Sequence, residues 1–143
     1  MKQASKDGAP KAFIYLRVST PGQVKKDYDP EGLSIPAQRK ACEQKVASLG
    51  AVVEGEFVEP GVSGGSVVKR KSFQAVLKEI RERGDIDFVV VWSVSRWARD
   101  QEDHWVARGQ IRRAGARLVS VKEPIGGETS AEIMMEGVLV GRP

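Results

Sequence analysis

Short apolar runs alternate along the chain with segments whose apolar residues recur at helical spacing, so the pattern predicts strands and helices in turn. The predicted strands are residues 11–18, 51–58, 88–92 and 117–121. The predicted helices are residues 34–49, 72–83, 103–114 and a further helix from Thr129 onward. This order predicts an α/β fold with a mostly parallel central sheet of four to five strands and helices on both faces.

Local signals place the ends of these elements. Ser34 and Ser72 are the predicted N-caps of the first two helices, and Gly50 and Gly84 end them. The fully apolar run FVVVW at 88–92 is typical of a strand in the middle of a parallel sheet. Residues 1–10 are polar and predict a flexible leader, and residues 93–100 predict a turn or a short helix.

Composition narrows the classes of protein. A chain of 143 residues with 41% hydrophobic and 29% charged residues suits one globular domain. The net charge of +4 is compatible with a polyanionic partner but is weak support for one. Cys42 and His104 are the single cysteine and the single histidine, which excludes a disulfide within the chain and a Cys/His zinc cluster. No apolar run is long enough to span a membrane, and we expect a cytoplasmic protein.

Candidate chemistry gathers where the first three strands end, which is where parallel α/β sheets place their sites. Arg17 and Ser19 are two apart and start on the same face of their strand. Arg96 and Arg99 are three apart, so one helical turn would place both on one side, and Arg70 follows a glycine-rich loop. Arginines around one hydroxyl repel one another unless an anion lies between them, and guanidinium groups match phosphate oxygens in pairs. A dense positive field would also favour the serine alkoxide.

Each of these features has an ordinary explanation when taken alone. Ser19 could be a turn former and Arg17 a residue at a sheet edge. Arg96 and Arg99 could belong to a solvated helix face. The glycine-rich segment 61–65 lacks the Lys-Ser/Thr ending of a phosphate-binding loop, which makes nucleotide binding a weak interpretation.

Two tryptophans and the single histidine are predicted to have structural roles. Trp92 and Trp97 are expected to pack in or beside the core. His104 lies in a polar helical stretch and is predicted to sit on an exposed helix face.

Four motifs in order carry a family resemblance. YLRVST at 15–20 resembles the Y-x-R-V-S-T nucleophile motif of the serine recombinases of the resolvase/invertase superfamily. EGLSIPAQ at 31–38 is similar to the E-G-x-S-x-x-x-Q stretch of the large serine recombinases, which include phage integrases. GVSG at 61–64, together with Arg70 and Phe73, resembles the G-x-S-G…R-x-x-F pattern of the family. SRWARD at 95–100 is similar to the D-R-L-x-R-[DN] block.

The resemblance implies roles for individual residues. Ser19 would be the nucleophile, and Gln38 would support the site by hydrogen bonding. Ser95 stands where the family has aspartate, which weakens any proposal of an acidic group there. The implied catalytic residues are Ser19, Arg17, Arg70, Arg96 and Arg99, with Gln38, Ser95 and Tyr15 in supporting positions and no metal. Residues 11–128 would be the catalytic domain, and 129–143 the start of a truncated long oligomerisation helix.

The resemblance also implies a reaction and partners. The reaction is site-specific DNA recombination, such as integration, excision or inversion, by cleavage and rejoining through a covalent 5′-phosphoserine, with no cofactor. The partner is double-stranded DNA, and the full-length protein would form a homodimer or homotetramer away from any membrane. The fragment lacks DNA-reading domains, so we expect weak, salt-dependent duplex binding and a monomer or weak oligomer.

Three alternatives stay open. The chain could be a non-enzymatic nucleic-acid-binding or regulatory domain with the same fold. It could be a hydrolase in which His104 activates the serine, although it lacks a G-x-S-x-G elbow. The arginines could also be scattered in the folded protein.

Overall fold

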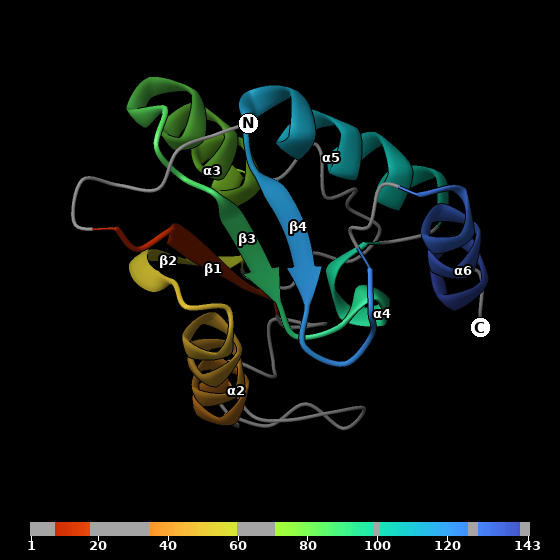
Figure 1. Ribbon diagram of the computed structural model, residues 1–143, viewed down its shortest axis with the longest axis horizontal. Coiled ribbons are helices and arrows are strands. Elements are labelled where there is room, and N and C mark those ends of the chain that lie inside the picture. The colour runs from red at the N-terminus through yellow and green to blue at the C-terminus, as the bar shows by residue number, and fades with distance from the viewer. Residues whose placement is uncertain (1–7, 18–34, 60–70, 99–100, 126–128, 141–143) are drawn as a thin grey trace.

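Four parallel strands form the centre of the molecule in a computed structural model that describes residues 8–17, 35–59, 71–98, 101–125 and 129–140 (Figure 1). The strands are β1 (Lys11–Arg17), β2 (Val52–Glu59), β3 (Phe88–Val91) and β4 (Arg117–Ser120), in the order β2-β1-β3-β4. The helices are α2 (Ile35–Ser48), α3 (Lys71–Arg83), α4 (Val94–Trp97), α5 (Gln101–Ala114) and α6 (Ser130–Val140). The predicted α/β class with a parallel sheet is therefore confirmed, and β1 and β3 are its central strands.

The sheet is covered on both faces, as predicted, and each face has its own hydrophobic cluster. Helices α3 and α5 lie over one face and α2 over the other (Figure 1). Alternation along β1 divides its side chains between the two clusters, because successive residues of a strand point to opposite faces. Phe13 and Tyr15 pack with α3 and α5, whereas Ile14 and Leu16 pack with Cys42 and Val46 of α2. The central strand is thus buried on both sides.

The glycine signals for helix ends are confirmed, whereas one predicted cap is wrong. Gly50 and Gly84 follow the ends of α2 and α3 with φ of +72° and +71°, a conformation that glycine adopts without steric cost. Ser72 lies inside α3, which begins one residue earlier, and its hydroxyl donates to the carbonyl oxygen of Val58 at 3.0 Å. Ser72 therefore joins α3 to β2. The predicted cap Ser34 lies outside the described residues.

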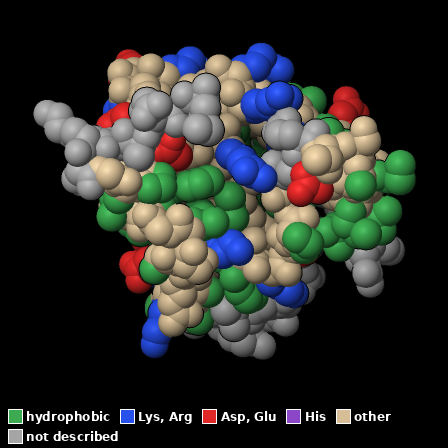
Figure 2. Space-filling model, viewed as in Figure 1, with side chains coloured by type: hydrophobic (Ala, Val, Ile, Leu, Met, Phe, Trp, Pro, Cys, Tyr) green, Lys and Arg blue, Asp and Glu red, His purple; other side chains and the backbone are tan. Residues whose placement is uncertain are grey.

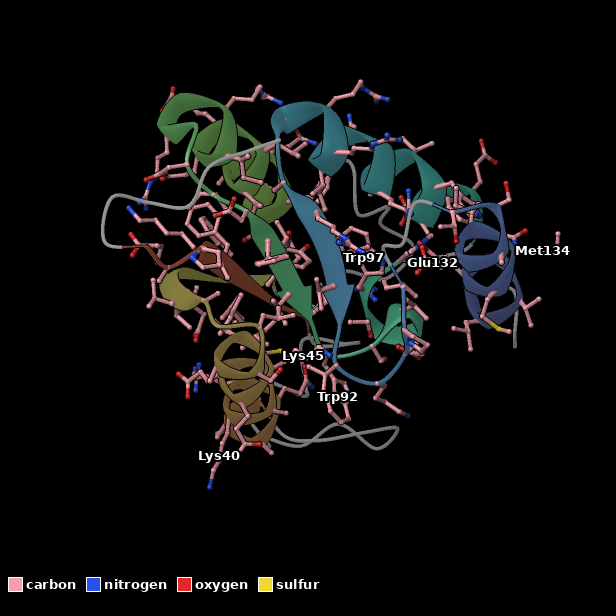
Figure 3. All side chains as sticks on the ribbon, in the orientation of Figure 1. Lys40, Lys45, Trp92, Trp97, Glu132 and Met134 are labelled. Atoms are coloured by element: carbon pink, nitrogen blue, oxygen red, sulfur yellow. The ribbon has the colours of Figure 1, made fainter. Side chains whose placement is uncertain are left out.

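Helix α6 begins with a capping box. The amide of Glu132 donates to the hydroxyl oxygen of Thr129 at 3.1 Å, and the amide of Thr129 donates to the carboxylate of Glu132 at 3.1 Å. Exposed apolar side chains cover much of the helix, and they form a hydrophobic surface at its position in Figure 2. Met134, 72% exposed, points away from the rest of the molecule (Figure 3).

Candidate active site

The carboxyl ends of β1, β2 and β3 meet at one edge of the sheet, because the strands are parallel. Of the predicted catalytic residues, Arg17 has a described side chain: it is half-buried, ends β1 and pairs in register with Glu59. Ser95 and Arg96 lie in α4, but their side chains are outside the described part of the structure. Three further predicted residues lie wholly outside it: Ser19, Arg70 and Arg99.

A buried carboxylate joins three elements at this edge. Glu59, 4% exposed, is the last residue of β2. Its Oε1 accepts a hydrogen bond from the hydroxyl of Tyr15 at 3.0 Å and another from the backbone amide of Phe73 at 3.3 Å. The second contact places a carboxylate in the first turn of α3, where free amides and the helix dipole favour it. Glu59 therefore fixes the end of β2 against β1 and the start of α3.

Sequence reasoning missed this role of Glu59. The second predicted strand, residues 51–58, stopped one residue short of Glu59. The strand continues because Glu59 still pairs in register with Arg17. The alternation of β2 carried a signal, since Phe57 is partly buried and Glu59, two residues later, points to the same face.

Three aromatic rings form the floor under this edge. The ring of Trp97 packs edge-on against Tyr15 at 6.1 Å and against Phe73 at 5.6 Å, and Tyr15 and Phe73 are 6.0 Å apart. All three side chains are at most 1% exposed. They come from β1, α3 and α4, so this aromatic floor fixes the mutual position of the three elements. The prediction that Trp97 packs in the core is confirmed.

Gln38 lies in the first turn of α2 and is 1% exposed. Helix α2 covers the face of the sheet opposite to the aromatic floor. Arg17 shares the face of Tyr15 by strand alternation, so Gln38 and Arg17 approach the edge from different sides of the sheet. A supporting role for Gln38 stays a prediction.

The predicted helical turn from Arg96 to Arg99 is not formed. Helix α4 ends at Trp97, and Ala98 is already extended, with φ of −122° and ψ of 150°. The spacing of three residues therefore gives no argument for a shared helix face, and the Arg96 side chain and Arg99 lie outside the described part of the structure. The start of α4 is fixed from outside: the amide of Val94 donates to the carboxylate of Glu123 at 3.1 Å.

Glu123 is another positioning residue that the sequence did not reveal. Its Oε1 also accepts a hydrogen bond from the hydroxyl of Ser120 at 2.6 Å. Ser93, which precedes α4, makes no side-chain cap. A residue 29 positions later in the chain thus caps the helix, and no local pattern signals such a contact.

The predicted exposure of His104 is wrong. His104 is 0% exposed, because α6 covers this side of α5 and supplies the carboxylate of Glu136. Both ring nitrogens have partners: Trp97 Nε1 donates to Nδ1 at 3.0 Å, and Nε2 lies 2.5 Å from Glu136 Oε2. A buried imidazole bound in this way disfavours the hydrolase hypothesis, which needs His104 to reach a serine hydroxyl.

We predict that Tyr15→Phe lowers the free energy of unfolding by about 1–3 kcal/mol, because it leaves the buried Glu59 carboxylate without its hydroxyl donor. Urea denaturation of the purified chain measures this loss. Ser72→Ala is the matched control: it removes one hydroxyl at the same β2–α3 junction, but from a solvent-accessible hydrogen bond, and should cost less than about 0.5 kcal/mol. Equal losses in the two variants would contradict the importance of the Tyr15–Glu59 bond.

Comparison with known proteins places this site in a family. The family model described as "Resolvase, N terminal domain" matches residues 12–141 of the chain. The chain belongs to the resolvase family, and it is a site-specific recombinase catalytic domain, a class that acts on DNA in oligomeric assemblies. No curated protein matches the chain. Among the described helices, none combines the length and apolarity that crossing a bilayer requires.

Solved structures with this fold include two recombinases and an integrase. The N-terminal catalytic domain of TP901-1 integrase is 24% identical, with 90% of each chain covered and a TM-score of 0.70. A resolvase family site-specific recombinase from Streptococcus pneumoniae is 25% identical over 91% of this chain and 83% of that one, with a TM-score of 0.66. The C-terminal catalytic domain of ISC1926 TnpA, an IS607-like serine recombinase, is 17% identical over 88% of this chain and 76% of that one, with a TM-score of 0.61.

Proposed function

We propose that this domain cuts and rejoins duplex DNA through a covalent bond between Ser19 and the 5′-phosphate at the break. Residues 11–128 would form the catalytic unit, and the helix that starts near Thr129 would take part in assembly. The proposal is more specific than family membership, since it names the nucleophile and the residues around it.

The observation that carries the proposal is the aromatic floor together with Glu59. The floor brings three elements to one edge, and each element is continuous with one predicted catalytic segment. In sequence, Tyr15 is four residues before Ser19, Phe73 is three residues after Arg70, and Trp97 directly follows Arg96. Segments that are far apart along the chain therefore start from neighbouring points, which is what a shared phosphate site requires.

The proposed cleavage step is a phosphoryl transfer. The Ser19 oxygen forms a bond to the DNA phosphorus, and the bond from phosphorus to the 3′ oxygen breaks. The hydroxyl proton of Ser19 passes to solvent, and the departing 3′ oxygen takes up a proton. Rejoining reverses these steps, when a 3′-hydroxyl attacks the phosphoserine. The phosphoester count is unchanged, so the reaction needs no ATP, and the arginines would stabilise the charge that a metal ion stabilises in other phosphoryl-transfer enzymes.

The arginines would supply the electrostatic part of catalysis. Guanidinium groups donate paired hydrogen bonds to non-bridging phosphate oxygens and offset the charge that builds up on the pentacoordinate phosphorus. Arg17 is the described member of this set, and its place at the end of β1 is two residues from Ser19. Arg70, Arg96 and Arg99 complete the proposed set. The same cations would lower the free energy of the Ser19 alkoxide, a role that histidine fills in other serine enzymes.

A trapping experiment tests the proposal. The full-length protein is mixed with a duplex substrate nicked near its recombination site, so that the cleaved strand diffuses away and the adduct accumulates. Denaturation, proteolysis and mass spectrometry then locate the attached nucleotide. We expect a 5′-phosphodiester on Ser19 that forms equally well with EDTA present. Attachment to another residue would refute the assignment, and binding without any adduct would favour the non-enzymatic alternative.

A further inference from the structure

A chain of buried polar side chains connects α4, α5 and α6. The indole Nε1 of Trp97 donates to Nδ1 of His104 at 3.0 Å. His104 Nε2 lies 2.5 Å from Oε2 of Glu136, and Arg108 Nε lies 2.8 Å from the same oxygen. His104 and Glu136 are 0% exposed, and Arg108 is 9% exposed. We refer to these four residues as the polar chain.

The hydrogen-bonding capacities of the groups fix the direction of the polar chain. An indole nitrogen can only donate, so Nδ1 of His104 must be the acceptor and its proton must sit on Nε2. Nε2–H then donates to the carboxylate of Glu136, which also forms an ion pair with the Arg108 guanidinium. One arrangement of protons satisfies both hydrogen bonds of His104, and this makes the polar chain selective for one relative position of the three helices.

The polar chain holds helix α6 against α5 through buried side chains, and an exposed hydrogen bond from Gln101 Nε2 to the carbonyl oxygen of Gly137 at 3.1 Å adds to it. Among its described side chains, Glu136 is the one that is buried, and Leu139 is partly buried against the main cluster. Ile133, Met134 and Val138 are exposed, at 39%, 72% and 58%. An apolar stripe permits sliding of one helix along another, whereas a buried carboxylate with two partners fixes the register.

The other end of the polar chain belongs to the candidate active site. Trp97 is the last residue of α4, directly after Arg96, and its ring is part of the aromatic floor. The indole therefore has two roles: its ring packs under the catalytic edge, and its N–H begins the polar chain that ends in α6. A change in the position of α6 therefore reaches the α4 turn through this indole as well as through the direct packing of α6 on α4.

We propose that His104 and Glu136 are positioning residues, which hold the α4 turn with Arg96 in its catalytic place by linking Trp97 to α6. The inference rests on the proposed function, because it assigns these residues to the phosphate site through Arg96. Neither side chain touches DNA in this proposal. By linkage, the seating of α6 and the placement of the α4 turn stabilise each other.

The first test measures cleavage by the full-length protein at saturating DNA in a single turnover. We expect Glu136→Leu and His104→Leu to slow formation of the Ser19 adduct by about 10- to 100-fold while the Kd for DNA changes little, since a small misplacement of a catalytic group has effects of this size. Glu136→Gln keeps an acceptor oxygen and should recover the rate to within about threefold of wild type.

Glu132→Gln is the matched control. It also removes an acid from α6, but Glu132 is exposed, and glutamine keeps the acceptor oxygen of the capping box. We expect it to retain the wild-type rate. A folded Glu136→Leu variant that cleaves as fast as Glu132→Gln would overturn the inference.

The second test needs neither DNA nor cleavage. We expect Glu136→Gln to shift the indole N–H resonance of Trp97 in a ¹H–¹⁵N spectrum, although Glu136 contacts Trp97 only through His104. The resonance is assigned by its loss in Trp97→Phe. The resonance of the Trp92 indole, whose ring lies under the Lys122 ammonium and outside the polar chain, should not shift. An unchanged Trp97 resonance would refute the link even if Glu136→Leu fails to fold. If Glu136→Gln shifts the Trp97 resonance but the wild-type protein forms no adduct, the proposed function is refuted and the link between Trp97 and Glu136 stands.

Discussion

Ser19→Ala in the full-length protein should abolish DNA cleavage, with the rate of adduct formation falling by at least about 10⁴-fold, the scale seen when a catalytic nucleophile is removed. The physical reason is that the variant retains the arginines that bind and polarise the phosphate but has no oxygen to attack it. Duplex binding should therefore survive. Gel-shift titration measures the binding, and denaturing gels of a nicked substrate measure the cleavage.

Ser48→Ala is a suitable control for this prediction. Ser48 is exposed at the end of α2, and its hydroxyl donates to the carbonyl oxygen of Lys45 at 2.7 Å. Its loss should leave both binding and cleavage at wild-type levels. Cleavage by Ser19→Ala at more than about one hundredth of the wild-type rate would mean that another group is the nucleophile.

The fold was predictable because its local signals agree with one another. The apolar run of β1 is buried on both faces, as a continuous run in a parallel sheet must be. Phe73, Val76, Leu77 and Ile80 recur at helical spacing and are the buried residues of α3. Glycines then end the helices at the expected positions. Each signal depends on residues within one element, which the sequence displays directly.

The errors concern contacts between elements. His104 lies in a polar stretch of its own helix, but Glu136, 32 residues later, makes its burial favourable. Glu123 caps α4 from a distance of 29 residues, and Ala98 leaves the helical conformation immediately after Trp97. Periodicity contains no information about such partners, because they are brought together only by the packing of the helices.

The catalytic residues of the candidate site were predicted from motifs, whereas the contacts that support them come from the structure. Motif order predicted its members, and Ser19, Arg70, Arg96 and Arg99 stay predictions at the level of their side chains. The described residues account for the support beneath them: the Tyr15–Glu59 bond and the aromatic floor. Glu59 supports the site without being part of a recognised chemical pattern, and a buried carboxylate of this kind is found from structure rather than from motifs.

Trp97→Ala should destabilise the fold more than Tyr15→Phe does, with a loss of about 3–5 kcal/mol in the free energy of unfolding. The side chain is 1% exposed and packs against Tyr15 and Phe73, so alanine would leave a cavity between three elements. It would also leave Nδ1 of buried His104 without its donor. For a domain of this size the loss corresponds to a fall in Tm of about 10–15 °C.

Trp92→Ala is the matched control, since it deletes the same side chain five residues earlier. Trp92 is half-buried, and its ring packs under the Lys122 ammonium at 5.9 Å, a contact worth about 0.5–1 kcal/mol. Urea denaturation of the two variants compares the losses directly. A cost for Trp97→Ala no greater than that for Trp92→Ala would mean that the aromatic floor does not hold α4 in place. The proposed convergence of the catalytic segments would then lose its physical basis, because the position of Arg96 depends on this packing.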